Sequence, residues 1–257
     1  MGNRFVHSAC LMVWLAAIAG GGAAESAPGA ATPDASAGGR APCGLRPVRL
    51  RCEYLANPLG IDVREPRLSW AVESEQNGQA QTAYRILAAS SEQRLAAGQG
   101  DLWDSGVVSS AETLHAPYAG TKLASRQRCY WRVQVWDKDG TPAGMSEIAW
   151  FEMGPLAPGD WQQAHWITGA HSDVSPRLRR AFTLRGPVAS ARLYICGQGA
   201  YEASINGQPV SDQVLGPTLS YFAKRMLYDT FDVTALVQPG DNALGVWLAP
   251  GWFGDPV

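Results

Sequence analysis

The stretch CYWRVQVWD (residues 129–137) decides the fold class, because apolar and other side chains alternate along its length. The alternation places four side chains on one side of the chain: Cys129, Trp131, Val133 and Val135. A period of two is that of a β-strand with one buried face. The strand is predicted to end at the turn DKDG (137–140), since Asp and Gly favour turns.

The same pattern recurs on both sides of this stretch. Further strands are expected at VRLRCEY (48–54), RLSWAVE (67–73), AYRILAAS (83–90) and EIAWFEM (147–153). The side chains expected to face inward on the first two are Val48, Leu50, Cys52, Tyr54, Leu68, Trp70 and Val72. One helical turn is expected between Glu92 and Gly98. Short alternating strands separated by turns predict a β-sandwich over residues 45–154.

A second β-domain is expected over residues 160–257. Its predicted strands include RLRRAFTL (177–184), ASARLYI (189–195), YEASI (201–205) and ALGVWLA (243–249). Asn206-Gly207 supplies the two positive-φ residues of a type I′ turn, which predicts a hairpin whose return strand, with Pro209, lies at a sheet edge. We count about six strands where a jelly roll has about eight. The domain is therefore expected to be incomplete and the sequence to be a fragment.

The N-terminus has the pattern of an export signal. Arg4 and His7 precede an apolar run from Ala9 to Ala19, and small residues follow up to Ala24. This run is too short to span a bilayer as a helix, which needs about 20 residues. Residues 1–24 are therefore predicted to be a signal peptide, and the protein to be secreted or periplasmic. Residues 25–44 are rich in Ala, Gly, Pro and Ser, which predicts a flexible linker.

Composition limits the classes of binding partner but does not show whether the cysteines form disulfides. A net charge of −2 argues against nucleic acid or an anionic membrane as a partner, since both favour a basic excess. The cysteines beyond the signal are Cys43, Cys52, Cys129 and Cys196. They could form two disulfides or remain as buried thiols. Because they contain no C-x-x-C pair, no zinc site is predicted.

Each domain resembles a known module. Pro66–Trp70 and the strand from Tyr130 to Val135, with Gly140 and Ser146 after it, resemble the fibronectin type III module. The second domain resembles a galactose-binding-like sandwich, through the Asn206-Gly207 hairpin, YDTFDVTAL (228–236) and PGDNAL (239–244). These resemblances imply an all-β fold: a fibronectin type III-like sandwich, then a truncated galactose-binding-like or jelly-roll sandwich.

Together the two domains resemble the N-terminal portion of bacterial α-L-rhamnosidases, glycoside hydrolase family 78. The matching blocks, in chain order, are residues 50–70, 101–106, 130–140, 150–166, 197–210, 224–234 and 239–246. The resemblance implies hydrolysis of terminal α-L-rhamnosides with inversion, by carboxyl groups on an (α/α)₆ barrel downstream of this segment. It also implies two partners, a rhamnose-containing glycan and the protein's own catalytic domain. Some relatives bind calcium in the second domain, but no ligands can be assigned here. Residues 216–220 and 249–252 depart from the family pattern.

The segment itself offers no convincing catalytic group. Its closely spaced carboxylates are Asp137 with Asp139, Asp229 with Asp232, and Glu73 with Glu75. All are expected in turns or at strand ends, where such side chains commonly form local hydrogen bonds. The four histidines show no metal-ligand spacing, and no nucleophile elbow or phosphate loop occurs. We therefore predict no catalytic or metal-binding residues, and no activity for the segment alone.

Sugar binding is the remaining function to weigh. Trp247 should point away from the face of Leu244, Val246 and Leu248, and Trp252 lies in a Gly-flanked loop. Exposed aromatic rings can stack on a sugar, so four candidates follow: Trp247, Trp252, Tyr201 and Tyr221. The alternative is that the two tryptophans pack against other domains. Trp70, Trp131 and Trp150 are expected in the sandwich core.

Two other readings of the whole chain remain. The first is a stand-alone secreted carbohydrate-binding or adhesion protein built from two β modules. The second is the front end of a family 2-type glycosidase, which would share the second sandwich. It predicts no NPLGID and PRLSW unit ahead of that sandwich, and this chain has both, at residues 57–62 and 66–70.

Overall fold

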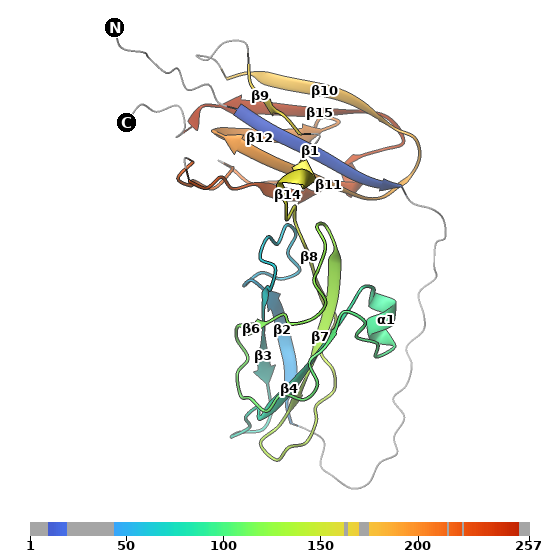
Figure 1. Cartoon of the computed structure of the whole chain (residues 1–257), viewed down its shortest axis with the longest axis vertical. Coiled ribbons are helices and arrows are strands. Elements are labelled where there is room, and N and C mark those ends of the chain that lie inside the picture. The colour runs from blue at the N-terminus through green and yellow to red at the C-terminus, as the bar shows by residue number, and fades with distance from the viewer. Residues whose placement is uncertain are drawn as a thin grey trace. The chain divides into compact units, whose positions relative to one another are not determined.

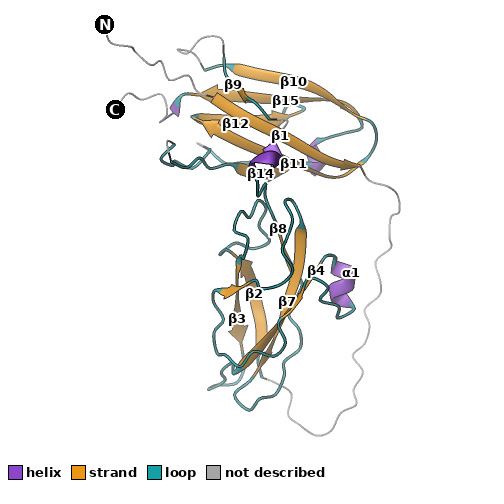
Figure 2. Cartoon of the chain, in the orientation of Figure 1, coloured by secondary structure: helices purple, strands orange, loops and turns teal. Residues whose placement is uncertain are grey.

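The computed structural model describes residues 10–19, 44–161, 164–169, 175–214, 216–222 and 224–251. The chain divides into two compact units, one of Pro28–Asp160 and one of Met1–Ala27 with Trp161–Val257 (Figure 1). We call the described part of the first, residues 44–160, the first sandwich. The described part of the second, residues 10–19 and 161–251, is the second sandwich. Strands dominate both, as Figure 2 shows, which confirms the all-β prediction.

The first sandwich consists of two antiparallel sheets. One has the order β2 (Arg46–Cys52), β3 (Arg67–Glu73), β6 (Ala116–Pro117). The other has the order β5 (Trp103–Asp104), β4 (Ala83–Ala89), β7 (Arg128–Trp136), β8 (Ala149–Glu152). The helix α1 (Glu92–Ala96) follows β4, where one helical turn is predicted, and the 3₁₀ turn η1 (Pro158–Trp161) follows β8. Ser91 caps α1 by accepting from the Arg94 amide at 3.3 Å.

Strand β7 forms the centre of the first core. Its four alternating side chains, Cys129, Trp131, Val133 and Val135, are all fully buried, as predicted. Leu68 and Trp70 of β3 pack against them from the facing sheet. The Trp70 indole N–H donates to Gln81 Oε1 at 2.9 Å, so the polar atom of this buried ring is satisfied.

Two side chains predicted to lie in this core lie outside it. Tyr54 is 53 % exposed, because β2 ends at Cys52 and the next two residues turn with positive φ. Its hydroxyl lies 2.8 Å from His115 Nε2. Trp150 is half-buried on the outer face of β8, where the Arg128 guanidinium lies 4.1 Å from its ring centroid. Alternation alone does not show where a strand ends or which face of the sheet is packed against other elements.

The described cysteines resolve the alternative left open by the sequence. Cys52, Cys129 and Cys196 are buried and unpaired. Burial raises the pKa of the Cys129 thiol to about 12 and that of Cys196 to about 11, so neither forms a thiolate at neutral pH. These thiols behave as small core side chains. Cys43 lies outside the described residues.

The second sandwich has two four-stranded sheets. One has the order β14 (Asp229–Asp232), β11 (Val188–Gln198), β1 (Cys10–Ala19), β9 (Trp166–Ile167). The other has the order β10 (Arg177–Leu184), β15 (Gly240–Ala249), β12 (Ala200–Ile205), β13 (Gln208–Pro209). The core between them includes Leu193, Ile195, Ile205, Val246 and Leu248. A 3₁₀ turn, η2 (Thr234–Leu236), joins β14 to β15.

Strand β1 is the unexpected element of this sandwich. It pairs antiparallel with β11 from Cys10 opposite Gln198 to Ala19 opposite Val188, and with β9 on its other side. The described part of residues 160–257 contributes seven strands, β9 to β15, where about six were expected, and β1 adds an eighth from outside that range. Residues 10–19 also form most of the apolar run of the predicted signal sequence, since such a run suits both an h-region and a β-strand. The signal peptide (1–24) and linker (25–44) stay predictions, and of these residues the structure describes β1 and Gly44.

The sequence motifs of the second sandwich hold its turns together. Asn206 (φ 52°) and Gly207 (φ 82°) form the predicted turn, and β13 with Pro209 lies at the sheet edge as expected. The Asn206 side-chain amide donates to Leu236 O and to Asn242 Oδ1, each at 2.9 Å. Its oxygen accepts from the Ala243 amide at 2.9 Å. The NG and PGDN motifs are thus hydrogen-bonded to each other, and they stabilise the fold.

Candidate functional site

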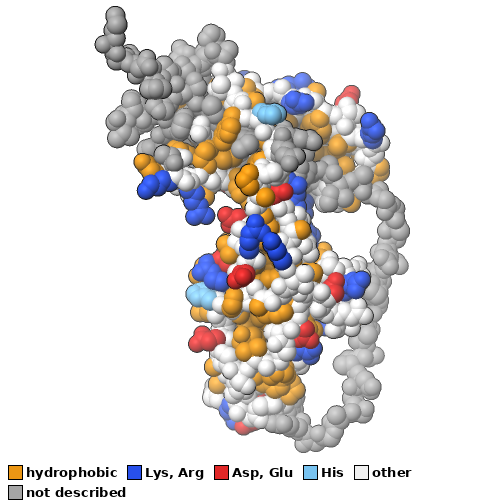
Figure 3. Space-filling view, in the orientation of Figure 1, with side chains coloured by type: hydrophobic (Ala, Val, Ile, Leu, Met, Phe, Trp, Pro, Cys, Tyr) orange, Lys and Arg blue, Asp and Glu red, His pale blue; other side chains and the backbone are white. Residues whose placement is uncertain are grey.

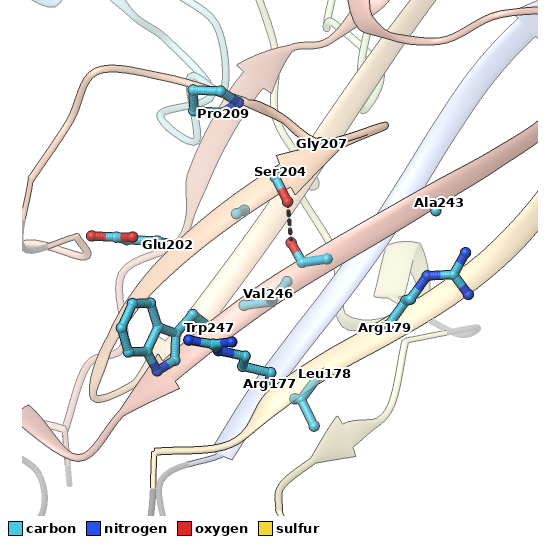
Figure 4. A pocket seen from close by; sticks show the side chains of 12 residues that line it. Arg177, Leu178, Arg179, Glu202, Ser204, Gly207, Pro209, Ala243, Val246 and Trp247 are labelled. Carbon is cyan, nitrogen blue, oxygen red and sulfur yellow. Dashed lines mark hydrogen bonds between the residues drawn. The ribbon is translucent and has the colours of Figure 1, made fainter.

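The outer face of the sheet β10–β15–β12–β13 contains a hollow of about 480 Å³ (Figure 4). Arg177, Arg179, Glu202, Ser204 and Trp247 are among the side chains that line it. Trp247 is 48 % exposed, whereas its neighbours Val246 and Leu248 are buried in the core. The predicted orientation of Trp247, away from the core face, is therefore confirmed.

The antiparallel register brings these side chains together in two rows. Arg177 of β10 and Glu202 of β12 both lie opposite Trp247 of β15. Two residues along each strand, Arg179 and Ser204 both lie opposite Gly245. Because adjacent strands are about 4.8 Å apart, the β10 and β12 side chains are separated by about 10 Å across the central strand.

Gly245 leaves the floor of the hollow open. A Cβ at this position would lie 3.0 Å from Ser204 Oγ, so a larger residue would fill the space between the two rims. The Ser204 hydroxyl reaches the Gly245 carbonyl at 3.4 Å, a long hydrogen bond that leaves the hydroxyl available to a ligand. Trp247, next but one along β15, closes one end of this floor (Figure 4).

Only one of the charged side chains around the hollow, Arg177, makes a polar or cation–π contact with another side chain of the described residues. The guanidinium carbon of Arg177 lies 4.9 Å from the centroid of the Trp247 ring, a cation–π contact. Among the described residues, Arg179 and Glu202 have no hydrogen-bond or ion-pair partner. The hollow therefore combines an aromatic ring, hydrogen-bonding groups and free charges of both signs, which is the chemistry of a polar ligand with an apolar face.

The other predicted sugar-binding residues do not join Trp247 in this hollow. Tyr201 is only 6 % exposed, and its hydroxyl donates to the Asp229 carboxylate, so the structure places it in the core. Burial raises the pKa of Asp229. Tyr221 is 69 % exposed in the segment after β13, with Lys224 Nζ 5.8 Å from its ring centroid. Trp252 lies outside the described residues.

Sequence reasoning missed the neighbours of Trp247. Arg177, Arg179, Glu202, Ser204 and Gly245 come from three strands that are far apart in the sequence. The alternation of RLRRAFTL puts Arg177 and Arg179 on one face, but only the register of β10 against β15 places them beside Trp247. That register could not be read from one sequence.

Two of the three close carboxylate pairs serve local structure. Asp137 accepts from the amides of Asp139 (3.0 Å) and Thr141 (2.7 Å), which forms the turn after β7. Asp232 accepts from the Thr234 amide at 3.0 Å and pairs with Arg192 at 3.0 Å. In the part of the chain that the structure describes, no three His, Cys, Asp or Glu side chains gather as a metal site.

On the face of the first sandwich shown in Figure 3, acidic and basic side chains are interspersed. Within the described ranges, no helix has the length and apolar character needed to cross a membrane.

Comparison with known proteins identifies both sandwiches. Residues 47–157 match the family model "Rha78A-like, N-terminal immunoglobulin domain". Residues 186–256 match the model "Alpha-L-rhamnosidase N-terminal domain". The first match agrees with the predicted fibronectin type III-like sandwich, since the two modules share one sandwich architecture.

Whole-chain relatives and solved structures agree with these matches. An α-L-rhamnosidase of Formosa agariphila is 37 % identical over 212 residues, which cover 78 % of this chain and 23 % of the relative. One of Alteromonas sp. is 34 % identical over 222 residues, covering 81 % and 24 %. The structure of an α-L-rhamnosidase from Dictyoglumus thermophilum is similar with a TM-score of 0.75 and 33 % identity, covering 79 % of this chain and 25 % of that one. The chain thus spans about a quarter of the length of these relatives.

The fold and the two matches define the class of this chain: an immunoglobulin-like domain followed by a β-sandwich similar to the N-terminal domain of α-L-rhamnosidases. Both sandwiches match N-terminal domains of α-L-rhamnosidases, so the chain is similar to the N-terminal portion of that family. The match over the first sandwich agrees with the argument from NPLGID and PRLSW against a family 2-type front end.

Proposed function

We propose that this chain is the N-terminal accessory region of a secreted α-L-rhamnosidase, which removes terminal α-L-rhamnose from glycosides or polysaccharides with inversion. The observation that carries the proposal is the tandem of two N-terminal domain matches over residues 47–157 and 186–256. Its proposed partners are a rhamnose-containing glycan and the catalytic domain of the same protein.

The proposed chemistry requires groups outside these two sandwiches. Inverting hydrolysis uses one carboxylic acid to protonate the leaving oxygen and one carboxylate to activate water, about 6.5–9.5 Å apart. The described Asp137 and Asp232 already accept backbone amides, and the half-buried Asp229 accepts a hydrogen bond from Tyr201. These carboxylates have fixed structural partners, which supports a non-catalytic role for the segment itself. Its role is to support the catalytic domain and hold glycan near it.

The hollow around Trp247 supports glycan holding. An exposed indole offers an apolar face to the C–H groups of a sugar ring. Ser204 and Glu202 can accept hydrogen bonds from sugar hydroxyls, and Ser204 can also donate one. Trp247 has an alternative role, which is to pack against a further domain. In that case the hollow would be covered in the whole protein.

Rhamnoside hydrolysis tests the proposed function. The product of the whole reading frame is expected to release aryl alcohol from an aryl α-L-rhamnoside, and ¹H NMR is expected to show the inverted anomer first. The 257-residue chain alone is expected to give no turnover above a heat-denatured control. Turnover by the chain alone, or a whole product without rhamnosidase activity, would contradict the proposal.

Export has its own test. Cleavage after Ala24 would give a mature N-terminus at Glu25, which mass spectrometry of the exported protein would detect. The same cleavage removes β1 and leaves β11 with an open edge, so retention of residues 10–19 in the mature protein would contradict the signal-peptide proposal and favour β1 as a permanent strand.

A second candidate function is a stand-alone secreted carbohydrate-binding or adhesion protein. The hollow around Trp247 favours it, since sugar binding there needs no catalytic domain. A reading frame that ends at codon 257, together with glycan binding by the chain, would select this function over the first.

A further inference from the structure

We propose that the hollow beside Trp247 takes a sugar ring that carries an anionic group, a carboxylate or a sulfate, in preference to a neutral sugar. The proposal rests on the proposed function in one respect, namely that the ligand of this face is a glycan. It adds the chemical class of the sugar and its orientation on the sheet.

The two rims of the hollow differ in charge. Arg177 and Arg179 alternate along β10, so both project from the same face of that strand. Glu202 and Ser204 occupy the matching positions of β12, on the far side of β15. A ligand above β15 therefore meets positive charge on one side and a carboxylate with a hydroxyl on the other.

The basic rim suits an anion with several oxygens. Positions two apart on a strand are about 6.6–6.8 Å apart, so rotation of the two flexible side chains can bring both guanidinium groups to one anionic group between them. In the structure the Arg177 guanidinium lies over Trp247 and that of Arg179 points the other way (Figure 4). A guanidinium presents paired N–H donors that match carboxylate geometry and bind oxyanions more strongly than neutral acceptors. Arg179 has no partner among the described residues, so binding an anion breaks no existing ion pair.

The acidic rim fixes the orientation of the ring. Glu202 lies about 10 Å from the β10 side chains, a separation that leaves room for one ring over Gly245 and Trp247. Its carboxylate repels an anionic group and accepts hydrogen bonds from hydroxyls. The anionic substituent is thus directed to β10, the hydroxyls to β12, and the apolar ring face to Trp247.

This face differs from an ordinary charged surface because the central strand β15 has no side chain at Gly245, which leaves a hollow between the two rims. Gly245 stands between Arg179 and Ser204, where a Cβ would approach Ser204 Oγ to 3.0 Å. A small side chain in place of this glycine would raise the floor without removing any charge. Gly245→Val is therefore expected to weaken ligand binding while the charges on both rims remain.

Isothermal titration of the full 257-residue chain tests the inference with matched ligands. The probes are a uronate-containing oligosaccharide and its carboxyl-reduced neutral counterpart, and then a sulfated oligosaccharide and its desulfated counterpart. The chain is expected to bind at least one anionic member about tenfold more tightly than its neutral counterpart, the effect of one additional charge-assisted hydrogen bond at a part-exposed site. The preference should decrease with added salt.

Three variants separate this site from general charge attraction. Arg179→Gln should remove most of the preference for the anionic ligand. Glu202→Gln should weaken binding of the neutral member more than that of the anionic member, because it removes a hydroxyl acceptor for both but a repulsion for the anionic one alone. Arg180→Gln is the control, because it removes the same charge from the next residue of β10, which projects to the opposite face. Circular dichroism and the melting temperature show whether each variant remains folded.

The outcomes distinguish the two proposals. Equal affinity for anionic and neutral members overturns the anionic preference and leaves glycan holding intact. An equal loss from Arg179→Gln and Arg180→Gln also overturns it, because the effect would then be one of net charge. If no sugar binds, both the site and the preference are wrong, while the rhamnosidase proposal still stands or falls on its own hydrolysis assay.

Discussion

Each sandwich carries an arginine over a half-exposed tryptophan, and the two pairs differ in what surrounds them. In the first sandwich Arg128 lies 4.1 Å from the Trp150 ring centroid and also donates to Glu152 at 2.8 Å. In the second, Arg177 lies 4.9 Å from the Trp247 centroid, without an ion-pair partner among the described residues. The Glu152 side chain is 9 % exposed, whereas Glu202 is free and exposed.

The difference teaches that residue types alone do not make a site. Both outer faces combine Arg, Trp and Glu, but in the first the charges neutralise each other and cover the sheet. In the second the central strand separates Arg177 from Glu202, and Gly245 keeps the floor low. The first pair therefore stabilises the fold, while the second remains open to a ligand.

Removal of residues 1–24 should have the largest effect on this comparison. Strand β11 would lose its ten-residue pairing with β1, and the sheet would open beside a core strand. The isolated variant is expected to lose protection of β11 and β14 in amide hydrogen exchange, while β4 and β7 of the first sandwich keep theirs. Unchanged protection in the second sandwich would show that β1 is dispensable. In an exported protein that has lost β1, the β11 edge would need another strand.

Core truncations test whether the two sandwiches unfold separately. Trp131→Ala should destabilise the first by about 3–5 kcal/mol, and Leu248→Ala the second by about 2–5 kcal/mol, since both side chains are fully buried. Each variant should shift only its own transition in urea unfolding. A coupled shift of both transitions would mean that the units share a cooperative core.

Removal of each stacked arginine compares the two outer faces directly. Arg128→Met removes the salt bridge to the buried Glu152 and should cost about 1–3 kcal/mol, reduced from the fully buried case because Arg128 is 30 % exposed. Arg177→Met should cost less than about 1 kcal/mol, since it removes one exposed cation–π contact. If both variants lower the free energy of unfolding equally in urea, then the Arg128–Trp150 pair is no more structural than the Arg177–Trp247 pair, and the comparison fails.

The pH dependence should differ in sign for one carboxylate of each sandwich. A hydrogen bond from Arg67 lowers the pKa of Glu53, so its stabilisation is present above the unfolded pKa and is lost as the pH falls through the folded pKa. Burial raises the pKa of Asp229, so the folded state binds its proton more tightly. Its contribution to stability therefore declines as the pH rises from the unfolded value through the folded pKa.

Urea unfolding between pH 3 and pH 7 measures these small contributions, with one variant for each sandwich. Glu53→Gln should flatten the loss of stability of the first sandwich in acid. Asp229→Asn should flatten the decline of the second with rising pH. An unaltered slope in either variant would show that the named carboxylate does not set it.

The sequence predicted well wherever the physical signal is local. The alternation of residues 129–135 specified the first core, and Asn206-Gly207 specified a hairpin, because strand period and turn conformation depend on neighbouring residues. Tyr54 and Trp150 were misplaced because a strand end and a second covering layer depend on distant parts of the chain. Likewise an apolar run cannot by itself distinguish a signal sequence from β1.

The candidate site was predicted only through Trp247. Its orientation followed from alternation within one strand, but Arg179, Glu202 and Gly245 meet it through the register of β10 and β12 on β15. The recognisable motifs gave no direct signal for the site. Asn206 and Asn242 bind each other, and Asp229 binds Tyr201, so these residues identify the fold.

The most direct test of the central claim is a titration of matched tryptophan variants with the best-bound glycan. Trp247→Ala is expected to weaken binding by about tenfold or more, since a stacked ring contributes on the order of 1 kcal/mol beyond its buried area. Trp150→Ala, which removes the comparable tryptophan of the first sandwich, is expected to leave the affinity unchanged. Wild-type affinity in Trp247→Ala, or an equal loss in both variants, would contradict the assignment of the ligand face to the second sandwich.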